Sequence, residues 1–229
     1  MVPTYNESEN IGLLTEKVFK IMRANNIDTE MIIVDDNSPD GTAEVAQTQA
    51  FAYPLKIIIR KDKKGLGSAI IDGINAAQSP VVCVMDADLS HPPEAIPEMF
   101  KLIQSGNAEL VIGSRRVKGG GTSEWIWYRK VIHWIAAFMG SFLTSVKDLT
   151  SGFFMFEKKI IDDIKLEPKS WKIGLEIIVK GRYDKYLECP ITFVEREAGK
   201  SKMGSKEVVA YLMHLLSLSI YKISHRKNR

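Results

Sequence analysis

Short apolar runs alternate with stretches of helical character through the first half of this chain, and that alternation restricts the folds it can adopt. The runs are three to five residues long and rich in β-branched side chains, at residues 31–34, 55–59, 81–85 and 110–112. Such runs are typical of strands buried on both faces of a sheet. Strands that alternate with helices lie parallel and are joined by right-handed crossovers. We therefore predict an α/β domain with a mostly parallel sheet flanked by helices.

Local patterns predict further elements around this framework. Residues 2–5 are expected to be the end of a strand whose earlier part is absent. Asn6, with Glu9 three residues later, resembles a capping box that opens a helix. A polar turn is expected at 148–152. Apolar periodicity also predicts helices at 68–78, 173–181 and 208–223 and strands at 153–156 and 191–194.

Two acids, Asp86 and Asp88, follow the apolar run at 81–85 with one residue between them. Ligands of open α/β sheets bind beyond the carboxyl ends of the strands, and paired carboxylates can share a divalent cation. A nucleotide diphosphate needs such a cation, so the pattern indicates a metal-assisted site. A solvated turn that happens to carry two acids is the alternative interpretation. Arg115 leaves a later strand at the same edge.

A basic segment near the end of the chain, 196–202, holds Arg196, Lys200 and Lys202 beside a glycine and a serine. These cations could close over a phosphate, or the segment could be an ordinary exposed loop. The net charge of +3 over 229 residues gives no indication of nucleic-acid binding. Cys83 and Cys189 show neither metal spacing nor a disulfide framework, which suits a reducing cytosol.

Two stretches favour contact with a membrane surface. Residues 125–130 combine tryptophans, a tyrosine and basic side chains ahead of an apolar helix, and the predicted last helix ends in the basic run 225–227. Such composition is typical of interfacial helices, although a helix packed on its own core is the alternative. The longest uncharged stretches, 131–146 and 208–221, are shorter than the roughly 18 to 20 residues that span a bilayer. We therefore expect a cytoplasmic protein, peripheral on the cytosolic face of the membrane.

Five segments in order resemble the family 2 glycosyltransferases, and most closely the dolichyl-phosphate (polyprenol-phosphate) mannose synthases. The segments are Pro3-Thr4-Tyr5-Asn6-Glu7, the run 34–42, Asp86-Ala87-Asp88-Leu89-Ser90-His91, Gly113-Ser114-Arg115, and Arg196 with Lys202. The resemblance covers essentially the whole chain. It implies the glycosyltransferase A fold, a Rossmann-like mixed sheet with interfacial amphipathic helices. The implied catalytic domain is 1–204, with an interfacial region at about 125–146, followed by a C-terminal amphipathic helix and basic tail at 205–229.

The resemblance also implies an activity and a site. The activity is transfer of mannose from GDP-mannose to dolichyl or polyprenyl phosphate in the membrane, with inversion, by an enzyme that uses Mg²⁺ or Mn²⁺. A small membrane-spanning partner subunit would suit a chain without its own spans. Ser90 stands where some relatives have a glutamine, so the implied metal ligands are Asp86 and Asp88 alone. The positions implied to hold guanosine are Pro3, Tyr5, Glu7, Val34 and Asp36; those for diphosphate and metal are Asp86, Ala87 and Asp88; and those for phosphates at the reaction centre are Arg115, Arg196 and Lys202.

Elementary chemistry agrees with these roles. A cation at the acid pair would neutralise charge on the departing nucleotide. The attacking lipid phosphate is already anionic at neutral pH, so no general base is needed. Cationic side chains must instead hold two anionic substrates together. We therefore take Asp88, Arg115, Arg196 and Lys202 as the catalytic residues.

Three rival interpretations stay open at this stage. A sister enzyme would transfer glucose or another hexose from a UDP-sugar to the same lipid. A receiver-like signalling domain would explain Asp35 and Asp36 after a strand, although this chain is much longer than that fold. A catalytically silent scaffold is the third, and the intact acids and cations argue against it.

Two departures from the family pattern are the short apolar segment before Pro3 and the lack of C-terminal membrane spans.

Overall fold

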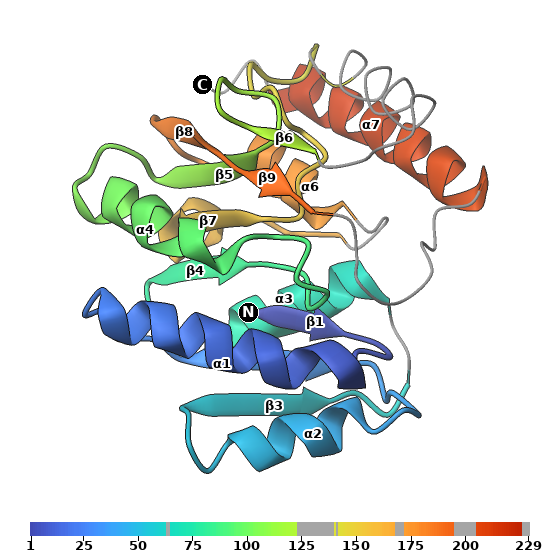
Figure 1. Ribbon diagram of the computed structural model, residues 1–229. Coiled ribbons are helices and arrows are strands. Elements are labelled where there is room, and N and C mark those ends of the chain that lie inside the picture. Colours follow the sequence, from blue (N-terminus) through green and yellow to red (C-terminus); the bar gives the residue numbers. More distant parts are fainter. Residues whose placement is uncertain (63–64, 123–139, 141, 168–171, 195–204, 226–229) are drawn as a thin grey trace.

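A central sheet with helices on both faces is formed by the residues that the computed structural model describes, which are 1–62, 65–122, 140, 142–167, 172–194 and 205–225 (Figure 1). The strands are β1 (Val2–Thr4), β2 (Met31–Asp35), β3 (Leu55–Ile59), β4 (Val81–Val84), β5 (Leu110–Ser114), β6 (Gly121–Thr122), β7 (Phe154–Glu157), β8 (Tyr186–Pro190) and β9 (Thr192–Phe193). The helices are α1 (Ser8–Ala24), α2 (Thr42–Gln49), α3 (Leu66–Ala76), α4 (Ile96–Gln104), α6 (Ile173–Lys180) and α7 (Ser205–His225), with 3₁₀ turns η1 (Pro93–Ala95) and η2 (Lys158–Ile161). The predicted α/β alternation is therefore confirmed.

Seven strands lie side by side in the order β3-β2-β1-β4-β7-β5-β8, with β6 and β9 as a separate short pair. Backbone hydrogen bonds join β1 to β4: the amino group of Met1 donates to the carbonyl of Cys83 (2.8 Å), and the Met85 amide donates to the carbonyl of Met1 (3.2 Å). Strand β7 runs antiparallel to β4 and β5, whereas the other ladders of the described strands are parallel. The sheet is mixed and mostly parallel, as predicted.

Alternation of side chains along the strands supplies a core on each face. Met31 and Ile33 pack in the cluster that contains the apolar stripe of α1, while Ile32 and Val34 face Ala69 of α3. Figure 1 shows α1 and α4 on the near face of the sheet and α3 and α6 behind it. Helix α7 packs against α6 and adds Tyr211, Leu215 and Leu218 to the second core.

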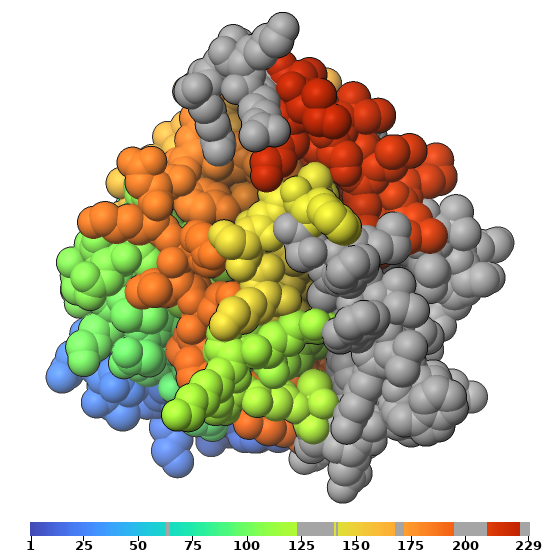
Figure 2. Space-filling view, turned by 90° about the horizontal axis from the view of Figure 1, so that it is seen from above, coloured from blue at the N-terminus to red at the C-terminus, as the bar shows by residue number. Residues whose placement is uncertain are grey.

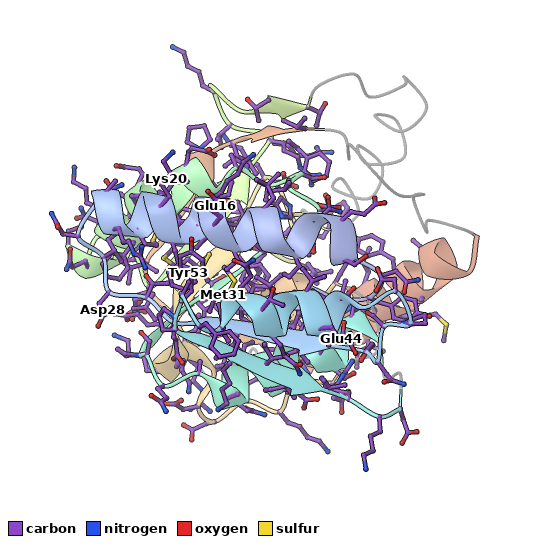
Figure 3. All side chains as sticks on the ribbon, turned by 60° about the horizontal axis from the view of Figure 1, so that its bottom comes forward. Glu16, Lys20, Asp28, Met31, Glu44 and Tyr53 are labelled. Atoms are coloured by element: carbon purple, nitrogen blue, oxygen red, sulfur yellow. The ribbon has the colours of Figure 1, made fainter. Side chains whose placement is uncertain are left out.

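Helix α1 separates solvent from core along its length. Glu16 and Lys20 lie on its exposed side, and Phe19 stacks on Tyr53 with ring centroids 4.8 Å apart (Figure 3).

Among the described residues, no helix is both long enough and apolar enough to cross a bilayer.

One local prediction is wrong, and another is confirmed only in part. Helix α1 begins at Ser8 with Glu7 as the N-cap residue, so Asn6 and Glu9 form no capping box. The amides of residues 6–8 donate instead to Ser38, Thr42 and Asp40 of the loop after β2, and these partners satisfy donors that a local cap would otherwise serve. The strand predicted at 191–194 shortens to β9, and β8 was not predicted because it is half exposed and carries Glu188 and Pro190.

Candidate active site

The predicted site residues that the structure describes gather at the carboxyl edge of the sheet. Tyr5 and Glu7 follow β1, Asp36 follows β2, the 86–88 turn follows β4, and Arg115 follows β5. Because β2, β1, β4, β7 and β5 are consecutive in the sheet, these positions share one edge. Pro3 and Val34 are buried register partners inside β1 and β2. Arg196 and Lys202, and the aromatic and basic cluster at 125–130, lie outside the described residues.

The turn that holds the acid pair is tightly built. The Asp86 side chain is 34% exposed, whereas Asp88 is buried and its Oδ1 accepts a hydrogen bond from the Ser90 amide (3.1 Å). Leu89 adopts a φ of 61°, a left-handed conformation that costs a bulky residue on the order of 1 to 3 kcal/mol. The buried Ser90 hydroxyl has no hydrogen-bond partner among the described residues. The turn therefore offers two carboxylates and one unsatisfied hydroxyl oxygen.

His91 packs against the backbone of this turn. Its Nδ1 accepts a hydrogen bond from the Asp86 amide (3.2 Å), so Nδ1 carries no proton there. Burial lowers the pKa of His91 to about 3, against the opposing charge of Asp88, and the ring is neutral. It stacks on Phe153 (5.3 Å between centroids) and meets Phe193 edge-on (5.4 Å). The histidine thus supports the backbone of the acid pair.

Arg115 is held by a buried carboxylate. Its backbone amide and Nε donate to Oδ2 of Asp148 (3.0 and 2.8 Å), and one terminal nitrogen donates to Oδ1 of Asp148 and to the Thr150 hydroxyl (2.8 Å each). The guanidinium also lies over the ring of Phe193, 5.4 Å from its centroid. Burial alone would raise the pKa of Asp148, but the hydrogen bonds and charge of Arg115 outweigh it and hold that pKa well below the usual range.

Lys172, just before α6, places a second cation near these groups. It is buried, and its ammonium donates to the carbonyl of Thr150. Burial and then the charge of Arg115 lower the pKa of Lys172 to about 7, while Asp86 and Asp148 oppose that shift. Gly152 brings the same turn against the acid pair, since a Cβ at this position would lie 3.3 Å from Oδ2 of Asp86.

Asp36 is tied to the start of α3. Its Oδ1 pairs with the buried guanidinium of Arg60, and its Oδ2 accepts a hydrogen bond from the Gly65 amide (3.0 Å). Arg60 also donates to Ser68 (2.7 Å) and Asp72 (3.2 Å). This ion-pair network holds Arg60 and the start of α3 beside the end of β2.

Comparison with known proteins places this arrangement in a family. The model of glycosyl transferase family 2 matches residues 1–165. The chain belongs to this family. The predicted resemblance to the family 2 glycosyltransferases is confirmed, and a receiver-like signalling domain no longer explains Asp35 and Asp36.

Two curated relatives of this glycosyltransferase share its sequence over most of its length. It is 42% identical to the dolichol-phosphate mannosyltransferase of Pyrococcus furiosus over 222 residues, 95% of this chain and 62% of that protein. It is 35% identical to the dolichol-phosphate mannosyltransferase of Saccharomyces cerevisiae over 233 residues, 97% of this chain and 86% of that protein. The chain thus spans under two thirds of the archaeal relative.

The fold of the glycosyltransferase also matches a solved structure. Glucosyl-3-phosphoglycerate synthase from Mycobacterium tuberculosis, in complex with Mn²⁺, UDP-glucose and glycerol 3-phosphate, superposes with a TM-score of 0.65 at 16% identity, over 96% of this chain and 78% of that one. The predicted glycosyltransferase A fold is confirmed.

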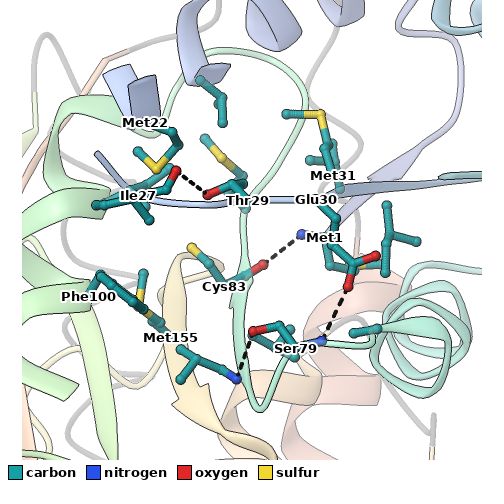
Figure 4. A pocket seen from close by; sticks show the side chains of 18 of the residues that line it. Met1, Met22, Ile27, Thr29, Glu30, Met31, Ser79, Cys83, Phe100 and Met155 are labelled. Atoms are coloured by element: carbon teal, nitrogen blue, oxygen red, sulfur yellow. Dashed lines mark hydrogen bonds between the residues drawn. The ribbon is translucent and has the colours of Figure 1, made fainter. Parts of the chain in front are cut away.

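A cavity of about 120 Å³ lies away from the acid pair (Figure 4). It opens at the amino ends of β2 and β4, the opposite edge of the sheet from Asp86, and is lined mainly by apolar side chains that include Met22, Met31, Phe100 and Met155. This cavity is therefore separate from the site that the acid pair marks.

Sequence reasoning missed several residues at the site. His91 lay inside a recognised motif without a role, and Asp148 lay in a turn noted only as polar. Arg60 and Lys172 carried no motif, although Arg60 directly follows a predicted strand at the edge where ligands bind. A charged residue at a strand end was the available signal.

Proposed function

We propose that this glycosyltransferase transfers mannose from GDP-mannose to the phosphate of dolichol or another polyprenol, with inversion at the sugar carbon. The observation that carries the proposal is the meeting, at one sheet edge, of the Asp86–Asp88 turn with Arg115 held by buried Asp148. The names of the two relatives support the choice of sugar and acceptor. Because the chain spans 62% of the archaeal relative, the activity of the whole protein is part of the proposal.

The residues of the acid turn fit a divalent cation. Asp86 and Asp88 supply carboxylate oxygens, and the Ser90 hydroxyl is a buried oxygen without a hydrogen-bond partner in the described part of the chain. Hard cations such as Mg²⁺ and Mn²⁺ prefer oxygen ligands of this kind. When bound, the ion supplies positive charge against the leaving diphosphate. The leucine in the left-handed conformation and the His91 contact keep the two carboxylates at the strand end.

The cations of the chain position the two anionic substrates. Asp148 holds Arg115 at the end of β5 through three hydrogen bonds, and the amine of Lys172 lies near it. Arg196 and Lys202, which lie outside the described residues, are proposed to contact phosphates at the reaction centre. The acceptor phosphate is an anion at neutral pH, so its attack on the sugar carbon requires no side chain to remove a proton. Catalysis then rests on positioning and electrostatic stabilisation.

The nucleoside is proposed to lie over β1 and β2. Tyr5 and Glu7 lie in the loop after β1, and the carboxylate of Asp36 is oriented by Arg60 and Gly65. Pro3 and Val34 are proposed to shape the nucleoside site through the backbone, and Ala87 the diphosphate site, since their side chains are buried in the sheet or its core.

A panel of sugar nucleotides tests this proposal. The purified protein is given a short polyprenyl phosphate, Mg²⁺ or Mn²⁺, and GDP-mannose, GDP-glucose, UDP-glucose or UDP-galactose in separate reactions. The proposal requires a lipid product from GDP-mannose. A product from UDP-glucose alone would support the sister enzyme, and no product with any donor would support an inactive scaffold.

Helix α7 is proposed to rest on the cytosolic face of the membrane. Figure 2 shows it running along the surface beside residues 142–160. One side of the helix is buried through Tyr211, Leu215 and Leu218, while four apolar side chains elsewhere on the helix are at least 60% exposed: Met213, Leu216, Ile220 and Ile223. Their spacing of three, four and three residues forms one stripe. A lipid surface, or a membrane-spanning partner subunit within it, would cover this stripe.

Leu216→Glu combined with Ile220→Glu is expected to release the protein from anionic vesicles. Burying each such side chain is worth about 1.5 to 3 kcal/mol, so the double variant should bind vesicles at least about tenfold more weakly. Flotation with phosphatidylserine vesicles at low salt measures this. Phe51→Glu is the matched control. Phe51 is 97% exposed and follows α2, which lies at the β3 end of the sheet (Figure 1). Equal flotation of the double variant and the control would contradict the proposed membrane face.

A further inference from the structure

Two side chains of β8, Tyr186 and Glu188, form hydrogen bonds with the loop that carries Asp148. The hydroxyl groups of Tyr186 and Ser145 share a hydrogen bond (2.7 Å). Two residues further along β8, Glu188 accepts hydrogen bonds from the amides of Lys147 at Oε2 (2.9 Å) and Asp148 at Oε1 (3.1 Å). Side chains two residues apart on a strand point the same way, so both contacts reach the loop from one face of β8.

These contacts continue directly to Arg115. The amide that Glu188 holds belongs to Asp148, whose carboxylate takes three hydrogen bonds from Arg115. Arg115 directly follows β5, and β5 pairs with β8 in a register that sets Ile112 opposite Glu188. Glu188 in β8 and Arg115 at the end of β5 therefore lie on two adjacent, paired strands.

We propose that Glu188 is a positioning residue for Arg115, acting through the backbone of Asp148. This inference rests on the proposed function, because it assumes that Arg115 must meet a substrate phosphate. Both carboxylate oxygens of Glu188 are engaged by amide donors, and hydrogen bonds to an ionised acceptor are about twice as strong as neutral ones. Displacement of a catalytic group by about 1 Å can cost about a hundredfold in rate. A carboxylate one step removed from the arginine can thus matter to turnover without touching a substrate.

Glu188→Gln disrupts the contacts to the two amides with almost no change in the size of the side chain. A glutamine has one carbonyl oxygen, so its NH₂ group must face one of the two amide donors. The loop is then expected to shift Asp148 and with it Arg115. We expect turnover to fall about tenfold to a hundredfold while the KM for the sugar nucleotide changes less than about twofold, since Arg115 would act mainly in the transition state.

The chain offers a matched control at the other end of the same strand pair. Oε2 of Glu109 accepts hydrogen bonds from the amides of Asp184 (2.7 Å) and Lys185 (3.3 Å), just before β8. Glu109→Ala therefore removes the acceptor of two backbone amides far along the strands from Arg115, together with the ion pair between Oε1 and Lys159 (3.3 Å). It should lower the free energy of unfolding at least as much as Glu188→Gln does and leave turnover unchanged. Equal losses of turnover in both variants would overturn the inference, because a general loss of stability would then explain them.

A double-mutant cycle tests the route through Asp148. In an Asp148→Asn background, Glu188→Gln should change turnover less than about twofold, since the contact it positions is already impaired. An undiminished effect in that background would overturn the inference. Arg115→Lys distinguishes a failure of this inference from a failure of the proposed function. Full turnover in that variant refutes the proposed role of Arg115. Low turnover of Arg115→Lys with normal turnover of Glu188→Gln refutes only the role of Glu188. If Glu188→Gln does not fold, Tyr186→Phe, which removes the adjacent hydroxyl contact, should show the same loss of turnover in weaker form, and unchanged turnover would count against the inference.

Discussion

Replacing Asp88 with alanine or asparagine is expected to lower mannosyl transfer by about a thousandfold or more, because charge stabilisation by a metal ion is worth several kcal/mol and each 1.4 kcal/mol is tenfold in rate. Asp88 is buried at the end of β4, and its Oδ1 holds the Ser90 amide. Alanine removes both the charge and this hydrogen bond, whereas asparagine keeps an oxygen for the amide. If the metal role is correct, both variants lose turnover alike, and alanine alone loses about 1 kcal/mol of stability.

Steady-state kinetics with Mn²⁺ and urea unfolding of the metal-free variants separate these effects. Asp28→Asn is the matched control, since Asp28 is an exposed acid before β2 at the opposite edge of the sheet. That variant should keep its full turnover. An Asp88→Asn enzyme with more than a tenth of the parent turnover, and with metal-dependent binding of GDP-mannose, would contradict the assignment of Asp88 to the cation.

Arg115→Ala is expected to damage both activity and stability. Its side chain is 9% exposed and that of Asp148 is 0% exposed, so the substitution leaves a buried carboxylate without its main partner. Breaking a buried pair in this way costs about 3 to 5 kcal/mol of the free energy of unfolding. Loss of a preorganised donor to developing charge should also lower turnover by about a hundredfold to a thousandfold.

A second substitution separates these two losses. In Arg115→Ala with Asp148→Ala, no orphaned carboxylate remains, so urea unfolding should show that much of the lost stability returns. Turnover should stay low, because the cation is still missing. Recovery of turnover together with stability would mean that Arg115 serves the fold alone.

The buried strands in the first half of this chain were predictable, but the order in which the strands pair was not. Runs such as 31–34 and 110–112 are buried on both faces and contain little except apolar residues, so composition alone indicates a strand. Nothing local indicates that β7 inserts between β4 and β5 or that it runs antiparallel. That insertion brings the 148–152 turn to the carboxyl edge. The role of Asp148 therefore depends on sheet order and could not be predicted from its surroundings in the sequence.

The acids and Arg115 were predictable because each follows a strand within a recognised motif. Glu188 was not, since β8 has only one buried residue and includes charge and proline, which weakens the strand signal. The capping box failed for a related reason. The amide of Asn6 donates to Ser38, which is distant in the sequence, and such a tertiary contact replaces the local cap. The residues proposed to orient others thus come from the structure, whereas the residues proposed to carry the chemistry were predicted from the sequence.

Identification of the lipid product tests the central proposal most directly. The protein is incubated with GDP-mannose, a short polyprenyl phosphate and Mn²⁺, and the product is separated by chromatography and examined by mass spectrometry and NMR. We expect one mannose joined to the lipid through a phosphodiester, with a β linkage because the α-linked donor is inverted. A hexose accepted only from a UDP-sugar, or mannose joined with retained configuration, would contradict it.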